Sequence, residues 1–296
     1  MQCIRFWLLW LPGFFLPPAV SLAASSNCQT FSLENGTMQL SVQIKGGEYP
    51  AVLTTSNVGA SISDRLAREL RLTQRVDPDL RVVSDTGEEQ EYLYSPDVPF
   101  TLFGIETSAD RMAITESDSR FITLSLRLFD GLIIQINFPD SRICFVDRSA
   151  LDLRREQNIE LDSGARFGIP AIQVSLNDDF DTWLELSPGF GGGVRVDSFV
   201  ADSLNLESED DNQNPLYPFE SATLDSLTFG PYQLGAIPVE FPKQNVRSNL
   251  TRRQETLTNT NVQDDRQTRG RIGIEVLKHF IVTLDLELER MHVFAP

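Results

Sequence analysis

Apolar and polar side chains alternate along much of the chain, which is the pattern of half-buried β-strands. Over residues 38–44 the sequence Met-Gln-Leu-Ser-Val-Gln-Ile places its apolar side chains on one face of a strand. The turn Lys45-Gly46-Gly47-Glu48 follows and leads into the apolar residues 51–53. This pattern predicts a β-hairpin, and residues 172–186 predict a second hairpin of the same design around a polar turn.

Helical spacing of apolar residues is confined to two short stretches. Ile62, Leu66 and Leu70 recur every four residues and predict a helix over residues 63–71. A similar pattern predicts a second helix over residues 197–204. Because strands dominate and the helices are short, we expect an all-β fold, mainly β with short helices.

The two hairpins belong to a longer internal repeat. Each is followed by a polar loop, an apolar strand and a helix, and each half of the chain closes with two similar strands. The closing strands, at residues 134–145 and 282–293, are offset by 148 positions, whereas the loops after the hairpins are offset by 133. The second half therefore holds about 15 extra residues, either in the acidic stretch Glu207–Asn214 or in the polar stretch Asn249–Arg271.

The repeat predicts two pseudo-symmetric lobes. The N-terminal lobe spans residues 24–150 and the C-terminal lobe spans residues 151–296, and each has a size that can fold as one unit. Residues 154–158 form a charged connector without an apolar face, which places the boundary near Ala150.

Residues 1–23 have the composition of a signal peptide. Arg5 precedes an apolar run over residues 6–16, and Ser21-Leu22-Ala23 has the small residues of a cleavage site. The alternative is a retained membrane anchor, but prolines and Gly13 break the run short of the ~20 apolar residues that a spanning helix needs. We therefore expect an exported protein, periplasmic or secreted, with no transmembrane segment after cleavage.

The charge balance is strongly acidic, with 42 Asp and Glu against 25 Lys and Arg and a formal net charge of −17. A nucleic-acid partner is not expected, because phosphate binding needs a basic face. Two His and three Cys leave little material for a metal site, and no cofactor is expected. Cys3 leaves with the signal peptide, so Cys28 and Cys144 are predicted to form a disulfide; two separate buried thiols are the alternative.

The repeated unit resembles one lobe of the retropepsin-like and pepsin-like aspartic proteases. Residues 270–285 read Gly-Arg-Ile-Gly-Ile-Glu-Val-Leu-Lys-His-Phe-Ile-Val-Thr-Leu-Asp, which is similar almost position by position to the segment that ends a lobe in that family. Residues 224–239 look like the mid-lobe hairpin of the family. The resemblance covers most of the chain after the signal peptide, strongly in the second lobe and weakly in the first. It implies two acid-protease-like lobes with a cleft between them.

In such enzymes each lobe supplies one aspartate from a loop that reads Asp-Thr-Gly. The two carboxyls share a proton, so that one acts as general base on a water and the other as general acid. By the repeat, the first-lobe loop here is Thr54-Thr55-Ser56 and the second-lobe loop is Ser187-Pro188-Gly189. Both aspartate positions therefore carry hydroxyl groups, which cannot activate water as a carboxylate does. The resemblance thus predicts a catalytically degenerate site, a pseudoenzyme.

The segment Leu161-Asp162-Ser163-Gly164-Ala165 matches the loop signature of the family directly. It leads into the second predicted hairpin, where the family has an apolar pair and a helix after its active-site loop. We therefore interpret the segment as a surface turn, in which Asp, Ser and Gly are favoured. Asp162 remains the alternative catalytic residue, and a dimer would then have to supply the second loop.

Three functions are compatible with these observations. The leading hypothesis is a degenerate member that binds a peptide or protein ligand in the cleft, because an extended strand can pair with exposed backbone there. The second is an active aspartic endopeptidase that uses Asp162 or another carboxylate. The third is a structural cell-envelope protein that acts through the loops at residues 207–221 and 249–271.

Overall fold

The computed structural model describes most of the chain that follows the predicted signal peptide. The described residues are 28–34, 36–55, 59–83, 89–117, 119–129, 131–162, 169–209, 217–246, 248, 250–253 and 267–296. The predicted signal peptide, Ser56 and residues 163–165 lie outside them. Within this described part, no helix is long and apolar enough to cross a membrane.

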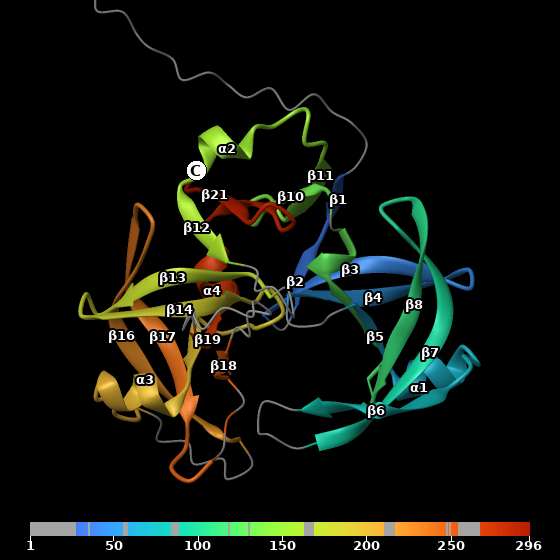
Figure 1. The fold of residues 1–296 in the computed structure, drawn as a ribbon, viewed down its shortest axis with the longest axis horizontal. Helices are drawn as coiled ribbons and strands as arrows, with labels where there is room; N and C mark the ends of the chain where they lie inside the picture. The colour runs from blue at the N-terminus through green and yellow to red at the C-terminus, as the bar shows by residue number, and fades with distance from the viewer. Residues whose placement is uncertain are drawn as a thin grey trace, which may run out of the picture.

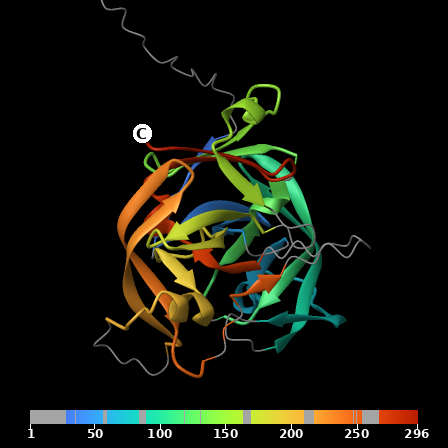
Figure 2. The same ribbon diagram turned by 60° about the vertical axis from the view of Figure 1, so that its left-hand side comes forward.

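The fold is all-β, with a lobe on each side of a central sheet (Figures 1 and 2). Six strands make up this central sheet, in the order β1 (Cys28–Thr30), β11 (Arg142–Val146), β10 (Ile133–Asn137), β20 (Ile281–Asp285), β21 (Arg290–Phe294) and β12 (Ile159–Asp162). At its middle, Gln135 of β10 lies opposite Thr283 of β20, and Gln135 Nε2 donates to Thr283 Oγ1 at 3.2 Å. These residues are 148 positions apart. Gln135 and Thr283 are also equivalent positions of the repeat, which has the same offset of 148 residues. Because equivalent residues pair with each other, a pseudo-twofold axis passes between them.

An eight-stranded sheet forms the first lobe. Its strand order is β2 (Ser32–Glu34), β3 (Thr37–Ile44), β4 (Gly47–Thr54), β9 (Ile122–Ser125), β5 (Ala60–Ser63), β8 (Ile105–Thr115), β7 (Glu89–Leu102) and β6 (Arg75–Val83). The first predicted hairpin is confirmed as β3–β4, with Leu40 opposite Ala51. The first predicted helix is confirmed as α1 (Asp64–Glu69), which Ser63 caps by accepting from Leu66 N at 3.4 Å.

The second lobe continues from the last strand of the central sheet. After β12 the order is β13 (Ala171–Leu176), β14 (Phe180–Leu186), β19 (Gln267–Ile272), β15 (Val194–Val196), β17 (Tyr232–Pro242) and β16 (Phe219–Phe229), with β18 (Arg252–Arg253) beside β19. The second predicted hairpin is confirmed as β13–β14. The second predicted helix is α3 (Ser198–Ser203), and Asp197 caps it by accepting from Val200 N at 3.0 Å.

The described residues also form three further short helices: η1 (Leu126–Phe129), α2 (Leu153–Glu156) and α4 (Ile274–Leu277). Helix α2 was not predicted, because it lies in the charged connector between the halves. Its first residue, Leu153, is buried, and in Figure 1 the helix lies beside β21 of the central sheet. Leu153 and the hydrogen bond from Asn158 N–H to the Met291 carbonyl at 3.3 Å both attach the connector to the fold.

The largest difference in length between the two lobes falls at one loop. Ala113 and Thr123 of the first lobe occupy the same places in the pairing pattern as Glu240 and Arg271 of the second. The first two are 10 residues apart and the second two are 31 apart. The second lobe therefore has 21 additional residues between β17 and β19, which is the second of the two predicted places. The prediction that placed the insertion at Glu207–Asn214 is wrong.

Aromatic side chains join each lobe to the central sheet. At the turn between β7 and β8, the Phe103 ring lies 4.5 Å from the Phe145 ring of β11, measured between ring centroids. In the second lobe, Phe280 precedes β20 and contacts Phe229 and Tyr232, at the turn between β16 and β17, with centroid distances of 5.3 and 5.1 Å. Both lobes thus use the tip of a long hairpin for the same purpose.

The predicted disulfide is confirmed. Cys28 and Cys144 lie opposite each other on β1 and β11, and their sulfur atoms are bonded. Because β1 is a three-residue strand at the edge of the central sheet, the bond supplements a short run of backbone pairing. It fastens the start of the described chain to the first half of that sheet.

An ion pair joins the segment that follows β11 to the turn that follows β20. Arg148 donates from Nη2 and Nε to both carboxylate oxygens of Asp285, at 2.6 and 2.8 Å, and from Nη1 to Glu287 at 2.8 Å. The side chain of Asp285 is only 3% exposed. These hydrogen bonds, first of all the one to Asp285, raise the pKa of the Arg148 guanidinium above its ordinary value.

We expect Arg148→Met to lower the free energy of unfolding by about 2–3 kcal/mol, because it leaves the buried Asp285 carboxylate without its cation. Solvent access to Arg148 keeps the effect at the lower end for such pairs. Urea unfolding at pH 7 measures it. Arg155→Met is the matched control, because Arg155 is 83% exposed, and we expect a change within about 0.5 kcal/mol. An equal loss in both variants would contradict a specific role for the Asp285 pair.

Candidate functional site

The two loops that the repeat identifies are delivered by equivalent strands. In the first lobe, β4 runs parallel to β9 and ends at Thr54, which lies opposite Ser125. In the second lobe, β14 runs parallel to β19, and its last residue Leu186 lies opposite Ile272. Ser187 follows and donates its backbone N–H to the Ile272 carbonyl at 2.8 Å. A parallel pair therefore sets the position of each loop.

The structure brings the two loops together at the junction of the lobes. Thr55 Oγ1 donates a hydrogen bond to the backbone carbonyl of Leu186, across 131 positions of sequence. Gly189 lies against the other loop, because a Cβ added there would be 3.3 Å from the Leu53 carbonyl oxygen and 3.5 Å from Thr54 Cβ. Thr54, Thr55 and Ser187 are all buried. The described residues of the two predicted loops thus lie together in one place.

Backbone contacts add to this junction. Met38 N–H, at the start of the first hairpin, donates to the Pro188 carbonyl at 3.2 Å. Gly36 and Gly191 approach so closely that a Cβ added to Gly191 would lie 2.9 Å from the Gly36 carbonyl oxygen. The loop around Ser187 therefore rests on the first hairpin of the opposite lobe.

Residues 270–273 pack against β15 and against the loop that follows Ser187. Gly270 has φ +155°, and a Cβ there would lie 2.0 Å from the Arg195 carbonyl oxygen. A Cβ on Gly273 would lie 2.3 Å from the Gly192 carbonyl oxygen. Glycine is required at both positions because the backbones come too close for any side chain. The glycine spacing in the sequence thus has a packing reason.

The chemistry of this site is that of hydroxyl groups. Thr54, Thr55 and Ser187 can donate and accept hydrogen bonds, but a hydroxyl does not exchange a proton near neutral pH as a carboxyl pair does. In the part of the chain that the structure describes, no group of three or more His, Cys, Asp or Glu is placed to hold a metal ion. Through these three hydroxyl groups the described part of the site can orient a polar group.

Asp162 lies in the fold differently from its prediction. It is the last residue of β12, paired with Ala171 of β13, and it is buried, so the surface-turn interpretation is wrong for this residue. The reason is that β12 extends one residue further than the turn pattern suggested and is covered by its neighbours. Ala171 in turn lies opposite Glu185 of β14. Asp162 is therefore two strands away from Glu185, about 10 Å between Cα atoms at the usual strand spacing.

A row of charged side chains crosses the second-lobe sheet beside Ser187, and sequence reasoning missed it. The row follows residues that lie opposite one another on neighbouring strands, in the order β12, β13, β14, β19, β15 and β17. Glu185 and Arg271 are 3% and 9% exposed. The alternation predicts that Glu185 and Arg271 face solvent, because their neighbours in the strand face the core. We call this set the charged row: Asp162, Glu185, Arg271, Arg195 and Glu240.

Arg195 is the best-defined member of the charged row. Its guanidinium lies between the Phe190 and Phe219 rings, 4.5 and 4.2 Å from their centroids, and its Nη2 donates to Glu240 at 2.5 Å. The Tyr217 hydroxyl also donates to Glu240, at 3.0 Å. The pKa of Tyr217 is raised above its ordinary value, mainly because the side chain is partly buried. Because Phe190 belongs to the Ser187 loop, Arg195 holds that loop against the sheet.

We expect Thr55→Val to lower the free energy of unfolding by about 2 kcal/mol, because it leaves the buried Leu186 carbonyl without its donor. Chemical denaturation measures the change. Thr107→Val, on the exposed part of β8, is the matched control and should change the free energy by less than about 0.5 kcal/mol. If the two variants are equally stable, the hydroxyl does not join the lobes.

Comparison with known proteins yields only distant likeness. No protein-family model and no curated protein matches the chain. Among solved structures it is similar to basic 7S globulin from soybean, with 8% identity and a TM-score of 0.43 over 91% of this chain and 94% of that one. It is also similar to a retropepsin-like aspartic protease from Rickettsia conorii, with 12% identity and a TM-score of 0.29 over 47% of this chain and 92% of that one. These scores do not assign the chain to a family.

Proposed function

We propose that the protein is an exported, proteolytically inactive protein of aspartic-protease-like form that binds an extended polypeptide between its lobes. One observation carries the proposal: the Thr54 and Ser187 loops are assembled across the lobes, yet both carry hydroxyls where a carboxyl pair would be needed. Loss of one member of a unit that acts jointly removes several orders of magnitude of rate. The retained assembly is therefore better suited to binding than to hydrolysis.

The first-lobe strands beside Thr54 offer a neutral surface for such a ligand. Val52 lies two residues before Thr54 on β4, so both side chains face the same side of the sheet, and Val52 pairs with Thr123 of β9. Both residues are half-buried. Both strands are paired on both edges, so an extended segment would lie across this face and contact Val52 and Thr123 with its side chains.

Binding without cleavage is the expected result with fluorescently labelled, unfolded β-casein as the probe. Anisotropy should show saturable binding, and mass spectrometry should show intact casein after incubation between pH 3 and pH 8. We expect Thr123→Arg to weaken binding, because it places a long cation beside Val52. Thr107→Arg is the control and should bind like the unchanged protein. Cleavage that pepstatin abolishes, or equal binding by all three proteins, would overturn the proposal.

An endopeptidase that uses Asp162 is the second candidate, because Asp162 is buried in one row with a second carboxyl, Glu185. It predicts casein cleavage at acidic pH that Asp162→Asn removes. Glu160→Asn, at an exposed position of the same strand, should then leave the cleavage unchanged. Intact casein with every variant would exclude this candidate.

Export is supported by the composition of residues 1–23. When the full chain is produced in a bacterial host, the mature protein should be recovered outside the cytoplasm with an N-terminus near Ala24. Recovery of the uncleaved chain from the cytoplasm would contradict export.

A further inference from the structure

The disulfide between Cys28 and Cys144 lies at the open edge of the central sheet. β1 is the outermost strand of that sheet, and among the described strands it pairs only with β11. Cys28 is exposed, whereas Cys144 is only 4% exposed. A thiolate that attacks a disulfide approaches along the line of the bond, from the side opposite the sulfur that leaves. For attack on Cys28 Sγ this side faces away from β11 and towards solvent, so Cys28 is the sulfur within reach of an external thiol.

Attack on Cys28 has a defined course. The thiolate of the external molecule bonds to Cys28 Sγ, the S–S bond breaks, and its electron pair leaves with Cys144 Sγ, which then takes up a proton. Arg142 lies two positions before Cys144 on β11, so the two side chains project to the same side of the sheet. A neighbouring cation favours the thiolate form of a cysteine. Arg142 therefore favours Cys144 as the leaving group.

Residues 28–34, which we call the strap, are held to the fold by few contacts besides this bond. Phe31 is the buried side chain of the strap, and the Phe31 and Phe138 rings meet edge to face with 5.8 Å between their centroids. Gln29 Nε2 donates to the Ser41 carbonyl at 3.3 Å, but Gln29 Oε1 is buried without a hydrogen-bond partner. A buried oxygen that lacks a donor offsets part of the stability that the other contacts contribute. The strap therefore depends on the disulfide to stay in place.

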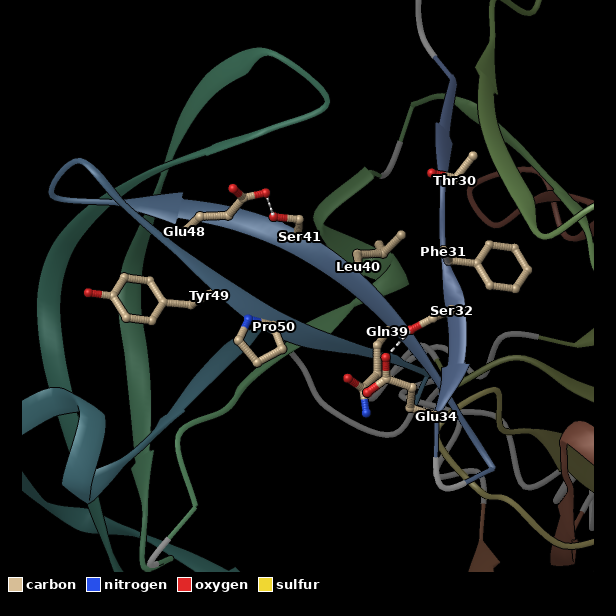
Figure 3. Close-up of a pocket in the computed structure, with 10 residues that line it drawn as sticks. All are labelled: Thr30, Phe31, Ser32, Glu34, Gln39, Leu40, Ser41, Glu48, Tyr49 and Pro50. Carbon is tan, nitrogen blue, oxygen red and sulfur yellow. Dashed lines mark hydrogen bonds between the residues drawn. The ribbon is translucent and has the colours of Figure 1, made fainter.

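The rest of the strap packs little against the first lobe. β2 pairs with β3 along its whole length, but all of the residues of β2 are exposed. A hollow of about 590 Å³ opens between the strap and the β3–β4 hairpin, where Figure 3 shows Thr30 and Phe31 apart from Glu48 and Tyr49. Opening of the strap therefore exposes little apolar surface besides that of Phe31. Segments with few buried apolar contacts are the ones that open at low free energy in a folded protein.

The strap leads directly to the candidate site. The chain turns at Gly36 into β3, and Gly36 lies against the Ser187 loop, because a Cβ added to Gly36 would be 2.8 Å from Gly191 Cα. Gly36 has φ +71°, in the left-handed region that favours glycine. Two residues later, Met38 N–H donates to the Pro188 carbonyl at 3.2 Å. The disulfide and the Ser187 loop are therefore attached to opposite ends of one short segment.

We propose that the Cys28–Cys144 disulfide is a site of thiol exchange, at which a low-molecular-weight thiol attacks Cys28 and releases the strap. The released strap no longer supports the turn at Gly36. The Ser187 loop then loses part of its support from the first lobe and binds a polypeptide more weakly. This effect on binding rests on the proposed function, whereas the exchange reaction does not depend on it.

Brief incubation of the folded protein with glutathione tests the exchange itself. After free thiols are blocked with an alkylating agent, mass spectrometry of peptides should find glutathione on Cys28 and the alkyl group on Cys144. The reaction should proceed while slow hydrogen exchange in β16 and β17 shows that the second lobe is still folded. Glutathione on Cys144, or a reaction that occurs only when the whole protein unfolds, would overturn the proposal.

Fluorescence anisotropy with labelled β-casein measures the effect on binding. The thiol-treated protein should bind casein about fivefold or more weakly than the oxidised protein, and its hydrogen exchange should be faster at residues 28–34, 36–38 and 187–191. If the oxidised protein binds casein and the thiol-treated protein binds it equally well, the inference is wrong and the proposed function stands. If neither form binds casein, the proposed function fails, and hydrogen exchange at residues 187–191 decides whether the strap supports the loop.

Two variants separate the strap from the chemistry of the thiol. Cys28→Ser/Cys144→Ser should bind casein as weakly as the thiol-treated protein and should not respond to glutathione. Phe31→Ala keeps the disulfide, so it tests the strap even if the double variant does not fold. We expect it to weaken casein binding by about threefold or more, because it removes the buried side chain of the strap. Leu33→Ala, at an exposed position of the strap, is the matched control and should bind like the unchanged protein. Equal binding by Phe31→Ala and Leu33→Ala would contradict a role for the strap.

Discussion

Replacing Cys28 and Cys144 together by serine is expected to lower the free energy of unfolding by about 4–5 kcal/mol. The disulfide spans a sequence separation of 116 residues, so it restricts the unfolded chain more than a short loop would. In the folded protein the two residues already lie opposite each other on β1 and β11. Strand pairing therefore positions the two thiols, and the bond acts mainly on the unfolded state.

Urea unfolding under oxidising and reducing conditions checks this expectation. The unchanged protein should lose the same 4–5 kcal/mol when a phosphine reductant is added, whereas Cys28→Ser/Cys144→Ser should not respond to it. Hydrogen exchange over residues 28–34 separates local fraying of β1 from global unfolding. A midpoint that is the same with and without reductant would show that the bond contributes nothing to stability.

The strands nearest the site could be predicted because their side chains follow a strict period of two. In β3 the residues Met38, Leu40, Val42 and Ile44 are all buried, and the alternation gave both the hairpin and its core face. Helices α1 and α3 could be predicted for a local reason as well, since their apolar residues recur at helical spacing. Local chemistry therefore determined these elements.

The long strands β6, β7 and β8 could not be predicted in the same way. Pro78, Pro96 and Pro99 interrupt the alternation, and the pairing of β6 with β7 shifts register between Asp77 and Arg81. Proline removes a backbone donor, so its position reads as a break even where an irregular strand tolerates it. Pairing with neighbouring strands holds these segments extended.

The candidate site was predictable in its positions and not in its contacts. The repeated order of hairpin, polar loop and short helix identifies Thr54 and Ser187 as equivalent, at an offset of 133 positions, which requires only the sequence. The hydrogen bond from Thr55 to Leu186 joins residues 131 positions apart, and no local pattern encodes it. Likewise Glu185 lies between the core residues Leu184 and Leu186, so the alternation predicts that its side chain faces solvent. In the structure Glu185 is buried, because other parts of the protein cover that face of the sheet as well. Burial on a second face is a property of the whole fold.

Phe280→Ala is expected to lower the free energy of unfolding by about 4 kcal/mol. The Phe280 side chain is 2% exposed and contacts Phe229 and Tyr232 at the tip of the β16–β17 hairpin. Removing the ring leaves a cavity between this hairpin and the central sheet, and neighbouring backbone cannot collapse into it because β20 is paired on both sides. The second lobe should therefore lose its main aromatic attachment to that sheet.

Phe294→Ala provides the matched control, because Phe294 lies on β21 of the same sheet and is 51% exposed. We expect a loss of less than about 1 kcal/mol there, since little apolar area leaves water on folding at that position. Phe280→Leu should fall between the two, because it keeps part of the buried volume. Urea unfolding measures all three variants. If Phe280→Ala and Phe294→Ala cost the same, the ring does not couple the lobe to the central sheet, and strand pairing alone would have to hold them together.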